Sequence, residues 1–143
     1  MIRPMTLADY DDLITLFTTT PGISVRDADS RENIDRYLQR NPGLSFVAEE
    51  QGRITGCCMA GHDGKRGYLQ HLVVATSARG NGLGRQLARA CVDALAAEGI
   101  LKSHLFVLKD NQDGHGFWRQ MQWKNRSEDF EVYSWIEGDN PNV

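Results

Sequence analysis

A hydrophobic strand pattern that runs straight into a glycine-rich turn and then a helix constrains this chain more than any other feature. Residues 67–75, GYLQHLVVA, have the apolar and β-branched character of a strand. The next stretch, ARGNGLGRQL at 78–87, holds three glycines and two arginines. From residue 83 to 98, apolar side chains recur at helical spacing. Because another strand follows, residues 68–108 predict a parallel, right-handed strand–helix–strand unit.

The glycine stretch has the properties of an anion site. Backbone N–H groups in the first turn of a helix lack partners inside the helix and carry partial positive charge. Glycines let an anion approach the backbone closely, and arginines add charge-assisted contacts. The pattern predicts a phosphate or pyrophosphate cradle made by Arg79, Gly80, Asn81, Gly82, Leu83, Gly84 and Arg85. A turn that only connects strand to helix is the alternative.

Two familiar nucleotide-binding loops do not fit this stretch. A Walker A loop ends in Gly-Lys-Ser/Thr, whereas Gly84 is followed by Arg85 and Gln86. A dinucleotide fingerprint has GxGxxG spacing and an acidic residue about 20 positions further on, and both are missing here. The spacing therefore indicates a different phosphate-bearing ligand.

The remaining patterns complete an α/β arrangement in one domain over residues 1–143. Helices are expected at about 6–18, 30–40 and 113–121, in addition to 83–98. Strands are expected at 1–4, 44–50, 53–62, 67–75, 103–109 and 130–136, with a tight turn at Gln51-Gly52. This order predicts a central sheet with mixed strand directions.

Composition narrows the class of protein. A formal net charge of −3 argues against a general nucleic-acid binder, which needs a broad basic surface. The first residues lack the apolar core of a signal peptide, and no apolar run approaches the roughly 18 residues of a membrane span. We therefore expect a cytoplasmic protein without membrane contact, whose three cysteines are reduced thiols. The adjacent Cys57 and Cys58 lack metal-site spacing, so no metal is expected.

Two ordered motifs give the chain a family resemblance. Arg79-x-x-Gly82-x-Gly84 resembles the R/Q-x-x-G-x-G/A signature of the GCN5-related N-acetyltransferases, the GNAT superfamily. Downstream, Asn111 with the Phe117-Trp118 pair resembles the second motif of that family. Within the superfamily, the chain looks like a group of small bacterial acetyltransferases whose substrates are mostly undefined. The resemblance implies the GNAT fold, with six to seven strands, about four helices, and a sheet splayed between its fourth and fifth strands.

The resemblance also implies acetyl-CoA as the cosubstrate. In this family the loop amides bind the pyrophosphate, and unpaired backbone groups of the fourth strand bind the pantetheine arm as an added strand would. Those groups correspond to Leu72, Val73 and Val74, where one amide is expected to polarise the thioester carbonyl. Asn111 is expected to contact the arm, although a plain turn residue is the other interpretation, and Phe117 and Trp118 are expected beside the cofactor.

The expected reaction is acetylation of a primary amine, which needs a group that accepts a proton. His71 lies next to the expected thioester position and is the first candidate base; a packed core histidine is the alternative. His104 is a second candidate. Trp118 stands where many family members have an acidic Tyr, so the acid is unassigned, with Tyr68 and Tyr133 as weak candidates.

Direct transfer in a ternary complex is favoured, because strand cysteines such as Cys57 and Cys58 are usually inert. The acceptor, a small molecule or a protein, is expected near the first two helices and the loop at 19–30. Charges of both signs occur in this region, at Arg26, Asp27, Asp29 and Arg31. The acidic residues would suit a cationic amine, but solvated loop charges are the favoured interpretation. A non-catalytic acyl-CoA-binding or sensing domain is the main alternative, and a nucleotide-phosphate binder is the second. An edge strand or the last strand offers a route to a homodimer.

Overall fold

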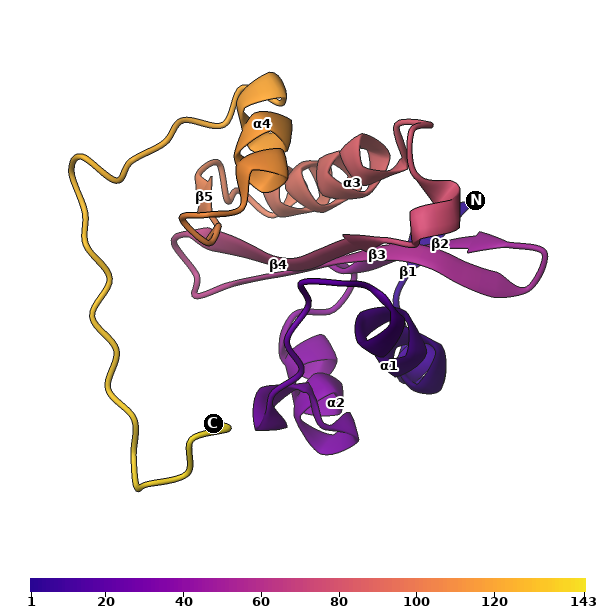
Figure 1. Cartoon of the computed structure of the whole chain (residues 1–143), viewed down its shortest axis with the longest axis horizontal. Helices are drawn as coiled ribbons and strands as arrows, with labels where there is room; N and C mark the ends of the chain where they lie inside the picture. Colours follow the sequence, from indigo (N-terminus) through magenta and orange to yellow (C-terminus); the bar gives the residue numbers. More distant parts are fainter. The chain divides into compact units, whose positions relative to one another are not determined.

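The computed structural model describes residues 1–143, which form two compact units, Met1–Leu105 and Phe106–Val143. In the first unit, a five-stranded sheet has α1 and α2 on one face and α3 on the other (Figure 1). Its main elements are β1 (Ile2–Pro4), α1 (Tyr10–Thr19), α2 (Arg31–Arg40), β2 (Phe46–Glu50), β3 (Arg53–His62), β4 (Gly67–Val74), α3 (Leu83–Ala97) and β5 (Ser103–His104). Three 3₁₀ helices, η1 (Leu7–Asp9), η2 (Asp27–Asp29) and η3 (Thr76–Ala78), precede α1, α2 and α3.

The sheet has the strand order β1-β2-β3-β4-β5. The first three pairings are antiparallel, and β2 turns into β3 at Gln51-Gly52, as predicted. The last pairing is parallel and holds only two residue pairs, Gly67 with Ser103 and Tyr68 with His104. The predicted mixed sheet and parallel strand–helix–strand unit are therefore confirmed.

The buried side chains of β3 explain how both faces of the sheet are covered. Cys57 and Met59 join a core cluster with Leu13, Phe17 and Ile34 from α1 and α2. Cys58 belongs to the α3 side, where its carbonyl accepts a hydrogen bond from the Cys91 thiol at 3.5 Å. Full burial of a side chain such as Phe17 stabilises the fold by about 1.5–3 kcal/mol, so these contacts hold the helices on the sheet.

The helix α3 packs closely on β3. Its buried face consists of Leu87, Ala88, Cys91 and Leu95, which agrees with the apolar stripe read from the sequence. A Cβ built on Gly56 of β3 would lie 3.0 Å from Leu87 Cδ1 and 3.1 Å from the Val73 carbonyl oxygen. A side chain at Gly56 would therefore push the start of α3 away from the sheet.

The second unit contains one helix, α4 (Gln112–Gln120). The Asn111 side chain caps it by accepting a hydrogen bond from the Gly114 N–H at 2.9 Å. The Trp118 ring meets the rings of Phe117 and Trp123 edge-on, each at 5.0 Å between centroids. These contacts form a small aromatic cluster on and just after α4.

The expectation of six to seven strands is wrong, because the sheet has five. The strand expected at 103–109 is reduced to Ser103–His104, and the segment 130–136 forms no strand. Its apolar residues Phe130, Val132, Tyr133, Trp135 and Ile136 are more than half exposed. Alternating apolar residues fit a pleated surface, but a strand also needs a neighbour to bind its backbone groups, and this segment has none.

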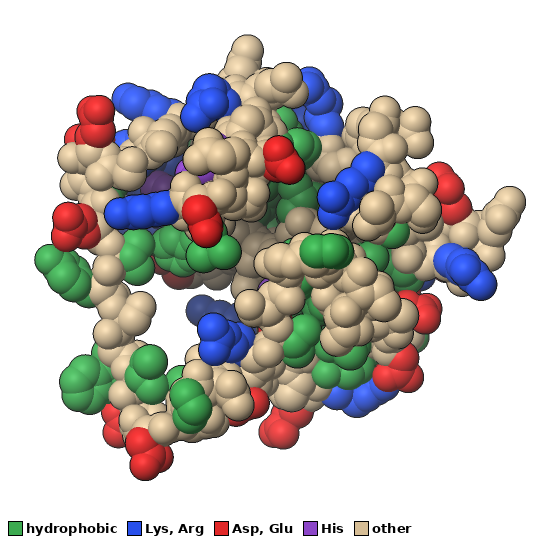
Figure 2. All heavy atoms as spheres, viewed as in Figure 1, with side chains coloured by type: hydrophobic (Ala, Val, Ile, Leu, Met, Phe, Trp, Pro, Cys, Tyr) green, Lys and Arg blue, Asp and Glu red, His purple; other side chains and the backbone are tan.

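The surface is mixed in charge. Figure 2 shows basic and acidic side chains interspersed over the face in view. None of the helices combines the length and the apolar character that crossing a lipid bilayer requires.

Candidate active site

The glycine stretch forms a left-handed turn at the start of α3. Gly80 has φ +87° and Gly82, the N-cap of α3, has φ +78°. An L side chain adopts such backbone angles at a cost of roughly 1–2 kcal/mol, so the two glycines are what allow the turn. The first helical hydrogen bond runs from the Gln86 N–H to the Gly82 carbonyl at 3.1 Å. The N–H groups of Leu83, Gly84 and Arg85 therefore have no hydrogen-bond partner within the helix.

The two arginines of the turn differ in their contacts. Arg79 Nε donates to the Val74 carbonyl at 3.1 Å, which ties the turn back to the end of β4. Arg85 and Asn81 are exposed, and Arg85 makes no ion pair. Unsatisfied amides, an unpaired guanidinium and glycines with no atom within 4 Å of a built Cβ leave room for a phosphate group at this helix start.

The edge of β4 is open beyond its short pairing with β5. The Ala75 N–H donates to the Thr55 carbonyl at 2.8 Å on the β3 side, and Val73 pairs with Cys57. Because backbone groups alternate in direction along an antiparallel strand, those of Val74 and Leu72 point to the other edge. On that edge the Val74 carbonyl meets Arg79, and no strand pairs with Leu72. An extended chain with amide groups fits such an edge.

His71 sits in a bulge of β4. The register between β3 and β4 shifts between Cys57 and Met59, and opposite this shift His71 has φ +50°. Left-handed backbone is uncommon for residues other than glycine, and it costs about 1–3 kcal/mol unless the surroundings hold it. Here the Cys57 thiol donates to the His71 carbonyl at 3.3 Å, and the imidazole stacks on Phe17 with 4.8 Å between ring centroids.

A buried carboxylate binds the imidazole of His71. Its Nε2 lies 2.7 Å from Asp29 Oδ1, and the second oxygen of Asp29 accepts the Arg26 N–H at 3.0 Å. Asp29 is only 5% exposed. Burial by itself would raise the pKa of Asp29, but the hydrogen bonds from His71 and Arg26 and the charge of the imidazole outweigh it and lower that pKa.

Asp29 is the functional candidate that sequence reasoning missed, because it was read as a solvated loop charge. That reading is wrong for Asp29, whereas it suits Arg31, whose ion pair with Asp11 at 3.0 Å is exposed. A local signal existed: an Asp just before the N-cap Ser30 can accept the N–H of a residue three positions earlier. No local pattern indicates that Asp29 would pair with His71, which lies 42 positions further along the chain.

The other candidate bases and acids lie elsewhere. His104 pairs with Tyr68 across β4 and β5, with 5.9 Å between ring centroids. Tyr133 lies in the exposed segment of the second unit. Asn111 and Trp118 also belong to the second unit, where Asn111 Oδ1 is used by the Gly114 amide, so its NH₂ group is the part left to bind a ligand.

The three cysteines have no access to solvent. Cys57, Cys58 and Cys91 are all 0% exposed and form no disulfide. Burial raises the pKa of Cys57 to about 12. A hydrogen bond with Cys91, together with burial, raises the pKa of Cys58 as well. At neutral pH Cys57 and Cys58 are therefore thiols, which are poor nucleophiles.

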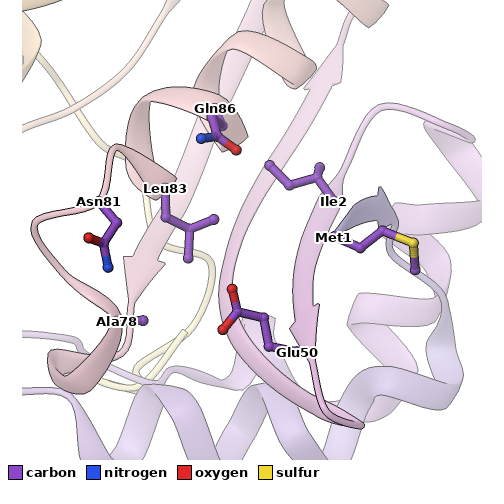
Figure 3. Close-up of a pocket in the computed structure, with 7 residues that line it drawn as sticks. All are labelled: Met1, Ile2, Glu50, Ala78, Asn81, Leu83 and Gln86. Atoms are coloured by element: carbon purple, nitrogen blue, oxygen red, sulfur yellow. The ribbon is translucent and has the colours of Figure 1, made fainter.

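A cavity of about 140 Å³ adjoins the glycine turn on the side of the N-terminal strand. It is lined by Met1, Ile2, Glu50, Ala78, Asn81, Leu83 and Gln86 (Figure 3). The Glu50 carboxylate would repel a phosphate, and the volume is small beside the several hundred Å³ of typical ligand pockets. The crevice shares Asn81 and Leu83 with the glycine turn, but its acidic wall and small volume do not suit a phosphate-bearing ligand.

Together these features define an α/β protein with a left-handed glycine turn at a helix start and an open strand edge before it. The chain belongs to the acetyltransferase (GNAT) family, which it matches over residues 10–123. It is 32% identical to an acetyltransferase from Pectobacterium atrosepticum over 123 residues, 86% of each chain. The reaction class is accordingly acetyl transfer.

Solved structures of low sequence identity share the fold. The PaiA N-acetyltransferase from Thermoplasma acidophilum in complex with coenzyme A has a TM-score of 0.74 at 20% identity, over 85% of this chain and 87% of that one. An aminoglycoside 6′-N-acetyltransferase from Acinetobacter haemolyticus has a TM-score of 0.76 at 18% identity, over 97% and 99%. These two likenesses concern the fold of the chain.

Proposed function

We propose that this protein transfers an acetyl group from acetyl-CoA to a primary amine by direct transfer in a ternary complex. The observation that carries the proposal is the open edge of β4 leading into the left-handed glycine turn. The turn and the start of α3 would hold the pyrophosphate, and the backbone of Leu72 and Val74 would hold the amide-bearing arm. The family supplies the acetyl transfer, and both fold neighbours named above are N-acetyltransferases.

Direct transfer is supported by the state of the cysteines. An acyl-cysteine intermediate needs a thiolate that can reach the donor. Cys57 is buried and its pKa is raised to about 12, so it stays a thiol at neutral pH. The acceptor amine is then expected to attack the acetyl group itself.

The test is release of free CoA thiol from acetyl-CoA in the presence of a panel of primary amines: a polyamine, an aminoglycoside, an amino-acid amide and a peptide with a free N-terminus. Turnover with at least one amine is expected, and initial rates with both substrates varied should give intersecting lines. Parallel lines would point to an acyl-enzyme instead. Tight acetyl-CoA binding without turnover on any amine would favour a sensing domain.

The glycine turn provides a variant test of the donor site. Gly82→Asp and Gly82→Asn differ in charge, while both residues tolerate left-handed backbone better than other side chains do. The carboxylate should weaken acetyl-CoA binding at least about tenfold relative to Gly82→Asn, since it would stand beside the pyrophosphate. Calorimetric titration measures both affinities, and equal values would remove the turn from the donor site.

A further inference from the structure

The imidazole of His71 is held by stacking on Phe17 and by a hydrogen bond with Asp29. We propose that Asp29 and His71 form a proton-accepting pair, in which Nδ1 of His71 takes the proton of the acceptor amine and Asp29 positions the ring. This inference rests on the proposed amine acetylation. It makes Asp29 a positioning residue for a base on β4.

The hydrogen bond decides which ring nitrogen is available. An ionised carboxylate is only an acceptor, so the 2.7 Å contact with Asp29 requires the proton on Nε2 of His71. Neutral imidazole then has its lone pair on Nδ1. The structure gives Nδ1 no hydrogen-bond partner, and the His71 side chain is 20% exposed. The nitrogen with basic character is thus the one that has no hydrogen-bond partner.

The backbone conformation of His71 sets the direction in which its ring points. The left-handed conformation of His71 and the bulge interrupt the regular alternation of β4 just before Leu72. Stacking on Phe17 and the bond to Asp29 then hold the ring on the α1 and α2 side of the sheet. Backbone in this conformation, held by its surroundings, is found mostly at functional sites, and His71 directly precedes Leu72 on the open edge.

Asp29 is itself held in place. Besides the Arg26 amide on its side chain, its backbone carbonyl accepts a hydrogen bond from the Tyr10 hydroxyl at 2.8 Å. Among the groups that contact His71, Phe17 from α1 is apolar and the Cys57 thiol of β3 is neutral. Asp29 of η2 is therefore the one charged group in contact with the imidazole.

The proposed step balances as follows. The lone pair of the neutral amine forms the N–C bond to the acetyl carbon, and the C–S bond breaks with its electron pair on sulfur. One amine proton passes to Nδ1 of His71. The products are the acetamide, the CoA thiolate and an imidazolium paired with Asp29, which later releases its proton to water.

The experiment compares Asp29→Asn with Asp9→Asn, a matched buried carboxylate on η1. Asp29→Asn should lower kcat about 10- to 100-fold, part of the roughly 10²–10⁴ that a general base contributes. It should also change the shape of the kcat/KM profile against pH, because the ring loses the carboxylate that pairs with it. The KM for acetyl-CoA should stay unchanged. Asp9→Asn should keep the wild-type kcat and profile.

A spectroscopic readout separates the pair from the activity. Nitrogen-15 shifts of the His71 ring should show the proton on Nε2 in the wild type, and a mixture of tautomers in Asp29→Asn. If the wild type is active and Asp29→Asn matches its kcat and profile, the positioning role is overturned while the proposed function stands. If the wild type acetylates no amine, the proposed function falls and the catalytic role falls with it.

Discussion

Two buried carboxylates in this molecule have the same local structure but pair with different kinds of side chain. Asp9 ends η1 and Asp29 ends η2, and each accepts the backbone N–H three positions earlier, from Thr6 at 2.9 Å and from Arg26 at 3.0 Å. Asp9 pairs with Arg3 and Asp29 pairs with His71, both at 2.7 Å. One partner is a guanidinium, which is always charged, and the other is an imidazole, which can donate or accept a proton.

The two pairs therefore suit different roles. Arg3 also contacts Glu49 at 3.2 Å, so it joins β1, β2 and η1 in one charged network. Hydrogen bonds with Asp9 and Glu49 raise the pKa of Arg3, so its guanidinium stays charged. His71 has no second carboxylate and keeps one nitrogen without a partner. The same helix-start geometry thus anchors a strand in one case and orients a titratable ring in the other.

The largest expected effect comes from removing the side chain that pairs with each carboxylate. His71→Asn keeps a residue that tolerates left-handed backbone but has no basic nitrogen, and kcat should fall by about 10²–10⁴. Arg3→Met should leave kcat unchanged but cost about 1–3 kcal/mol of stability, because Asp9 loses its partner. Steady-state kinetics and urea unfolding measure both. Comparable losses of kcat in the two variants would erase the functional difference between the pairs.

Acid should affect both pairs in the same direction. The pKa values of Asp9 and Asp29 are lowered in the folded protein, so each group contributes stability that is complete above the carboxyl pKa of the unfolded chain, near 4. That stability is lost as the pH falls through the lowered folded-state pKa. Each Asn variant should flatten the fall in unfolding free energy by up to about 1.4 kcal/mol per pH unit.

The control for the acid experiment is Asp11→Asn, since Asp11 is exposed even though it pairs with Arg31. Urea unfolding at several pH values between about 7 and 3 measures the slopes. A slope that changes as much with Asp11 as with Asp29 would show that burial and pairing do not set the acid response.

The smallest effect concerns the capping residues near the two carboxylates, Thr6 three positions before Asp9 and Ser30 directly after Asp29. Ser30 Oγ accepts the Asn33 N–H at 3.2 Å and caps α2, whereas Thr6 Oγ1 only approaches Asp9 at 3.5 Å. Ser30→Ala should therefore cost about 0.5–2 kcal/mol, and Thr6→Ala less than about 0.5 kcal/mol. Thermal unfolding of both variants gives the ranking, and an inverted order would contradict the cap assignment.

The sequence predicted the elements whose signal is local. The turn at Gln51-Gly52, the helix α3 and the glycine loop follow from turn chemistry and helical periodicity over a few residues. The strand at 130–136 was predicted from alternation, but pairing depends on a distant neighbour that alternation does not report. The Asp29–His71 hydrogen bond could not be predicted for the same reason, because it joins η2 to β4, which are far apart in the chain.

The bulge at His71 has a consequence for solubility. A strand with a free edge invites pairing with a second chain, and regular edges lead to sheet-to-sheet aggregation. Here the left-handed residue breaks the repeat of β4, and Arg79 covers the carbonyl of Val74 at its end. A second regular strand would meet an interrupted row of backbone groups along this edge, whereas the short amide-bearing arm proposed above needs only a few of them.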